Sequence, residues 1–99
     1  MSTSFAPPFK LQSASVQQLL ADTNAREALL AQIVAQFERK YGISLEELEK
    51  RLEHGNYSEH PAWEDSIEWR NAVEQRERVQ LTRSILNWLS NLLAQSASS

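Results

Sequence analysis

Two histidines and their acidic neighbours are the residues of this sequence that could bind a metal ion. His54 and His60 lie near Glu59 and Glu64, and imidazole and carboxylate groups are both zinc ligands. A zinc site needs ligands that converge on one point, commonly cysteines or a closely spaced histidine pair. Here a segment containing Gly55 separates the histidines, and the chain has no cysteine. We therefore predict no metal site and no cofactor, with His54 on the surface and His60 at a helix start.

Adjacent carboxylates are the second arrangement with catalytic potential. They occur as Glu46/Glu47 and as Glu64/Asp65. General acid–base catalysis requires two groups in a cleft, with pKa values that differ. Both pairs instead lie beside predicted helix starts, where capping and the helix dipole favour acidic residues. We predict no catalytic residues and no enzyme activity.

Four arginines in the C-terminal third could contact phosphate groups. Glu74 and Glu77 lie between them, and the net charge of the chain is −3. Nucleic-acid binding needs a concentrated positive surface, so a solvated face with ion pairs is the favoured interpretation. A nucleic-acid-binding regulator is therefore a less favoured function. The four are Arg70, Arg76, Arg78 and Arg83.

The C-terminal third predicts one long helix over residues 60–95. Proline is tolerated at the first helical position, so His60-Pro61 is a suitable start, and no Pro or Gly follows it. Such a helix is about 50 Å long, more than a compact domain of this size can cover. Residues 70–80 are polar, so a bend there is the alternative to a continuous helix, which we prefer.

Two apolar stripes run along the far half of this helix. The first has the 4-3-4 spacing of a coiled-coil core, and the second lies beside it. Together they can contact two neighbouring elements, which predicts a helical bundle completed by oligomerisation. We expect the first stripe to be a protein interface. The stripes are Leu81, Ile85, Trp88 and Leu92, and Val79, Leu86, Leu89 and Leu93.

Residues 13–55 predict two further helical segments that form a hairpin. After a short helix that begins near Ser15, the sequence at 22–24 favours a turn and a new helix start. Helical periodicity then continues until Gly42, which can end the helix in a left-handed conformation. Ser44 and Glu47 fit a capping box, and Gly55 closes the short helix that follows. We predict an all-α fold in which this hairpin, bent at Gly42, packs on the long helix.

The two ends of the chain are predicted to be tails around one helical domain, 13–95. Residues 1–12 contain Pro7 and Pro8, which favour an extended conformation, and residues 96–99 are expected to be disordered. Phe5 and Phe9 are unusual in a tail. They could cover the core of the chain, dock onto a partner or have no role, and as possible partner contacts both are candidate interface residues.

Large aromatic residues gather around the start of the long helix. Tyr57, Trp63 and Trp69 are favoured as core residues, because a small helical fold needs large side chains to fill it. Trp63 and Ile67 share one face, whereas Trp69 points away from them. Because interface hot spots are enriched in Trp, Trp69 is the candidate for an exposed anchor.

Membrane and export signals are not evident in the sequence. No apolar run reaches the roughly 20 residues that span a bilayer, and the N-terminus lacks the pattern of a signal peptide. We expect a cytoplasmic protein without membrane association.

One segment, Lys40 to Trp69, is similar to a group of known proteins. It contains KYGISLEEL at residues 40–48 and HPAWEDSIEW at 60–69. This segment resembles small helical prokaryotic proteins, some of which are similar to the antitoxin halves of toxin–antitoxin pairs. The resemblance implies a non-catalytic protein that binds and masks a partner, here a small toxin-like protein. A self-assembling scaffold or adaptor subunit is the alternative, with the first stripe pairing copies of the same chain.

Overall fold

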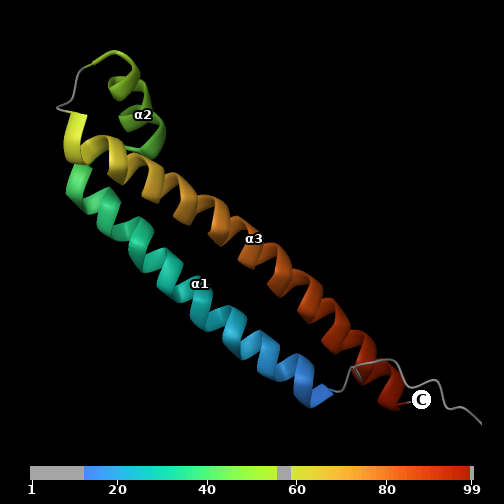
Figure 1. Cartoon of the computed structure of the whole chain (residues 1–99). Helices are drawn as coiled ribbons and strands as arrows, with labels where there is room; N and C mark the ends of the chain where they lie inside the picture. Colours follow the sequence, from blue (N-terminus) through green and yellow to red (C-terminus); the bar gives the residue numbers. More distant parts are fainter. Residues whose placement is uncertain (1–12, 56–58, 99) are drawn as a thin grey trace, which may run out of the picture.

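The protein consists of three α-helices in the part of the chain that the structure describes. A computed structural model describes residues 13–55 and 59–98, which contain α1 (Ser13–Tyr41), α2 (Leu45–Glu53) and α3 (Glu59–Ser98) and no strand. α1 and α3 run antiparallel and side by side, while α2 packs on α3 near the start of that helix (Figure 1). The predicted all-α fold, in which the N-terminal helices pack on a long C-terminal helix, is confirmed.

α1 is a single helix, so the predicted turn at residues 22–24 is wrong. The polar side chains there bond within the helix: the Thr23 hydroxyl donates to the Leu19 carbonyl at 2.7 Å, and Gln18 donates to the Asp22 carboxylate at 3.1 Å. Val16, which precedes residues 22–24, is fully buried, and Leu30, which follows them, is buried as well. Packing on α3 along both halves therefore outweighs the local preference for a turn.

The turns on either side of α2 follow the predicted capping chemistry. Gly42 and Gly55 have φ angles of +66° and +70°, the left-handed conformation expected of helix-ending glycines. The Ser44 hydroxyl accepts a hydrogen bond from the Glu47 amide at 3.1 Å, as predicted for the N-cap. The Glu47 carboxylate, however, accepts from Arg51 at 3.2 Å. These two glycines and the serine cap fix where α1 ends and where α2 begins and ends.

α3 is an uninterrupted helix of 40 residues, about 60 Å long. The continuous helix predicted through residues 70–80 is confirmed, because α1 supports that segment along one side (Figure 1). The helix also continues to Ser98, so the prediction of a disordered tail from residue 96 is wrong for 96–98. No Pro or Gly interrupts the sequence after Pro61, so nothing in the chain ends the helix earlier. None of the helices described is long and apolar enough to cross a membrane.

The main hydrophobic core lies where all three helices meet. Its buried side chains come from α1, α2 and α3, and Leu48 of α2 is fully buried. Toward the C-terminal end of α3 the core narrows to the contact between α1 and α3. The buried members of this core are Leu30, Val34, Leu45, Leu48, Trp69, Ala72 and Val79.

Candidate protein-interaction site

The first apolar stripe lies exposed on α3. Leu81 and Trp88 are 64% and 61% exposed, and Ile85 and Leu92 are also among the exposed large hydrophobic residues. These side chains recur at helical spacing along one side of α3. Four large apolar side chains thus form a continuous strip that no described residue covers.

The second stripe packs against α1. Val79 and Leu86 are buried, and Leu89 and Leu93 are half-buried. Because the two stripes lie on different sides of α3, burying one of them leaves the other open. The two stripes together were predicted to contact two neighbouring elements. α1 is the first of these, and the described residues do not include the second.

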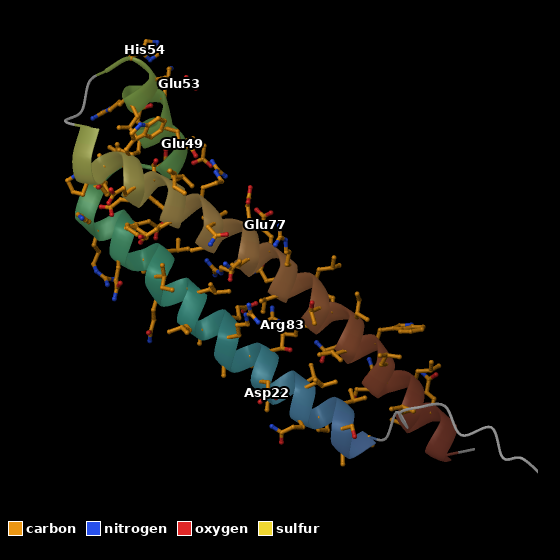
Figure 2. All side chains as sticks on the ribbon, in the orientation of Figure 1. Asp22, Glu49, Glu53, His54, Glu77 and Arg83 are labelled. Carbon is orange, nitrogen blue, oxygen red and sulfur yellow. The ribbon has the colours of Figure 1, made fainter. Side chains whose placement is uncertain are left out.

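The exposed strip continues toward the start of α3, where sequence reasoning placed core residues. Trp63 and Ile67 are 52% and 65% exposed, so the assignment of Trp63 to the core is wrong. Between the two apolar sections lie exposed Glu74 and Arg78. Figure 2 shows neighbouring Glu77 on the side of α3 away from α1. We call the whole strip the outer face of α3: Trp63, Ile67, Glu74, Arg78, Leu81, Ile85, Trp88 and Leu92.

Trp69 is not an exposed anchor. It is 2% exposed, and its ring stacks on Phe37 at 5.8 Å and on Tyr41 at 6.2 Å between ring centroids. Both partner rings belong to the last turns of α1, which faces α3 on the side opposite the outer face. Trp63 and Trp69 lie on different sides of the helix, as predicted. Trp63, however, is on the exposed side, and Trp69, the candidate for an exposed anchor, is on the buried side.

Phe5 and Phe9 lie outside the described residues, as does Tyr57. Their assignment to an interface or to the core stays a prediction. Among the described residues, the outer face is built from α3 alone.

Ion pairs also link α3 to both other helices. Arg83 donates to Glu27 of α1 at 2.6 Å, and Arg70 donates to Glu49 of α2 at 2.6 Å. Figure 2 shows Arg83 between α1 and α3. The hydrogen bond with Glu49 raises the pKa of Arg70 above its ordinary value. The row of arginines considered for phosphate binding is thus divided, because two of its four members are held by carboxylates of neighbouring helices.

A further polar contact fixes the end of α1 on α3. The Asp65 carboxylate accepts hydrogen bonds from Lys40 at 2.6 Å and from the Tyr41 hydroxyl. These two donors lower the pKa of Asp65, the Lys40 contact first and the Tyr41 contact second. The acidic residue considered for catalysis therefore joins two helices. Within residues 13–55 and 59–98, no group of three metal-binding side chains is close enough to hold an ion.

The sequence as a whole matches one protein family. The match is to the uncharacterized protein MJ0235 family and extends over residues 11–94, which include all of α1 and α2 and all of α3 except its last four residues. The chain belongs to the MJ0235 family. No curated protein and no solved structure matches it. The family is described without an activity or a partner, and the match does not link the chain to toxin–antitoxin proteins.

Proposed function

We propose that this protein is a non-catalytic interaction module that binds and masks another protein through the outer face of α3. The observation that carries the proposal is the exposure of Leu81, Ile85, Trp88 and Leu92 on one side of a well-packed helix. Burying apolar surface contributes about 25 cal/mol per Å², so contact with a partner is favourable here. Contiguous exposed apolar surface of this kind commonly marks an interaction site.

The spacing of these side chains indicates what kind of surface would bind. Residues at i, i+4, i+7 and i+11 form the ridge that packs into the groove of another helix. A helical segment of the partner is therefore the element that we expect on the outer face. Trp88, near the middle of the apolar section, is the expected anchor, since Trp is enriched among the residues that dominate binding energy.

Two properties support an antitoxin-like role for this binding. Residues 40–69 resemble small helical proteins that include antitoxin-like chains, and in the structure this segment forms the turn, α2 and the start of α3. The net charge of −3 also favours a basic partner, through electrostatic attraction during encounter. A small basic protein encoded beside this chain is the partner that we expect.

A photo-cross-linking amino acid at position 88 tests the proposal in the cells that produce the protein. Gln32, an exposed residue of α1, provides the matched control position. We expect a cross-link to a different protein from position 88 and not from position 32, with the partner identified by mass spectrometry. The Leu81→Asp substitution should abolish that cross-link. Adducts at both positions, or at neither, contradict the proposal.

The masking step needs a second measurement on the identified partner. We expect the partner alone to inhibit growth and co-expression of the wild-type chain to restore it. The Leu81→Asp/Trp88→Asp variant should fail to restore growth while keeping the helical circular-dichroism spectrum of the wild type. Equal rescue by both chains contradicts binding through the outer face.

A self-assembling scaffold or adaptor subunit is the second candidate function. The observation that favours it is the symmetry of the outer face, where exposed apolar sections lie at both ends of a charged section. A cross-link from position 88 to another copy of this chain, and to no other protein, would support the scaffold instead.

A further inference from the structure

We infer that a second copy of this chain binds on the outer face of α3, with the two α3 helices antiparallel and a two-fold axis near residue 76. The inference rests on the outer face being a binding surface, as the proposed function does. It goes further than the proposed function because it states which molecule binds when no other partner is present, in which orientation and in which register.

The order of side chains along the outer face is what a second copy can match. Trp63 and Ile67 form one apolar section, and the residues from Leu81 to Leu92 form the other. When two such helices run in opposite directions about residue 76, the section with Trp63 and Ile67 in one copy lies on the section from Leu81 to Leu92 in the other copy. Ile67 and Ile85 are both nine positions from residue 76, so they face each other across the contact.

The charged section determines the orientation. Glu74 and Arg78 are each two positions from residue 76, so an antiparallel pair places Glu74 opposite Arg78 of the second copy, twice by symmetry. A parallel pair in the same register would instead place Glu74 on Glu74 and Arg78 on Arg78. Opposed like charges are unfavourable across helix contacts, whereas opposite charges favour the complex.

Both charged side chains are available for such a contact. Glu74 and Arg78 are exposed, and neither forms an ion pair with another residue in the described part of the chain. The neighbouring arginines on α3 differ from them, because Glu49 holds Arg70 and Glu27 holds Arg83. Glu74 attracts Arg70 electrostatically, but among the described residues neither Glu74 nor Arg78 is held in an ion pair as Arg70 and Arg83 are, so both can approach a second copy.

The arrangement of the helices leaves space for a second α3. α1 lies along the other side of α3, and α2 contacts α3 beside Arg70 (Figure 1). Trp63 and Ile67 stay exposed next to α2, so the far half of the second α3 can lie along them. The outer face from Trp63 to Leu92 is about 44 Å long at 1.5 Å per residue, which allows contact over many turns. A different partner on this face would first have to separate the two copies.

Single cysteines test both the occupant and the orientation, since the natural chain contains none. The variants Ile67→Cys and Ile85→Cys are oxidised separately and as a mixture, with Gln32→Cys as the control. We expect a disulfide-linked dimer only in the mixture, between position 67 of one chain and position 85 of the other. In either variant alone the two sulfurs would lie about 27 Å apart, too far for a bond. Disulfide formation within one variant, or in no sample, overturns the inference.

A charge exchange tests the register. We expect Glu74→Arg to weaken the dimer roughly tenfold, because two like-charge contacts replace two attractive ones. The double variant Glu74→Arg/Arg78→Glu should restore the dissociation constant measured by analytical ultracentrifugation. Equal affinity of all three chains, or a double variant weaker than the single one, contradicts this register. Failure of these tests leaves the cross-link from position 88 to a different protein unaffected, so the two proposals can fail separately.

Discussion

The two ends of the α1–α3 pair differ in how completely α3 is surrounded. At the end that carries α2, three helices enclose Trp69, which stacks on two aromatic rings of α1. At the other end α1 is the only neighbour that the described residues provide, and Leu81, Ile85 and Trp88 are exposed. The comparison shows that a long helix in a small chain is stabilised at one end by the chain itself. At its other end, and along the side of α3 that carries Trp63 and Ile67, large apolar side chains are exposed.

Replacing a tryptophan at each end should separate the two roles most strongly. We expect Trp69→Ala to lower the free energy of unfolding by about 3–5 kcal/mol, because it removes a buried ring from the core. Trp88→Ala should change it little at protein concentrations where the chain is monomeric. Denaturant unfolding followed by circular dichroism measures both. A large effect of Trp88→Ala under monomeric conditions would contradict the exposure of Trp88 in the single chain.

The contribution of α2 to the closed end can be tested at Leu48, its fully buried residue. We expect Leu48→Ala to cost about 2–5 kcal/mol, since it leaves a cavity where the three helices meet. The exposed Glu53 of the same helix offers a control, and Glu53→Ala should stay within about 0.5 kcal/mol of the wild type. Similar effects of the two substitutions would show that α2 does not support the core.

The turn that leads into α2 should have a smaller effect. Gly42 has a φ of +66°, which costs an L-residue about 1–2 kcal/mol. We therefore expect Gly42→Ala to lower the unfolding free energy by about 1 kcal/mol, measured by thermal and denaturant unfolding. The space around a Cβ at this position is open, so any loss reflects backbone conformation and not a clash. Unchanged stability would contradict the helix-ending role of this glycine.

Acid should weaken the contact between α1 and α3 at Asp65. The pKa of this carboxyl is lower in the folded chain than its ordinary value of 3.8, so the contact stabilises the fold above that pH. The stabilisation is lost as the pH falls below 3.8 toward the lower folded pKa. We expect Asp65→Asn to show a flatter decline of stability in this acid range than the wild type. Identical profiles would contradict the assignment.

Local chemistry made much of the fold predictable from the sequence. Gly42, Ser44 and Gly55 determine turns through conformations and hydrogen bonds that involve only neighbouring residues, so their roles could be predicted. The turn at residues 22–24 was predicted wrongly because distant packing on α3 decides that helix. A single sequence gives little information on such long-range contacts.

The candidate site was predictable at one end of α3 and not at the other. Leu81 to Leu92 could be identified because their spacing is unbroken, but the sequence did not show which stripe α1 would cover. The first stripe, extended backwards, reaches Ile67 and Trp63, and Trp63 was predicted to be a core residue. Extending the second stripe from Val79 by seven residues leads to Ala72, and three residues earlier to Trp69. The second stripe, extended in this way, identifies the buried side of α3 from the sequence alone.

The solution mass from light scattering tests most directly whether a second copy of this chain covers the outer face of α3. We expect twice the chain mass of 11.3 kDa for the wild type and for the control Gln32→Asp. We expect a single chain mass of 11.3 kDa for Leu81→Asp/Trp88→Asp. A wild type that stays at 11.3 kDa at every concentration, or a double variant that keeps the wild-type mass, would contradict it.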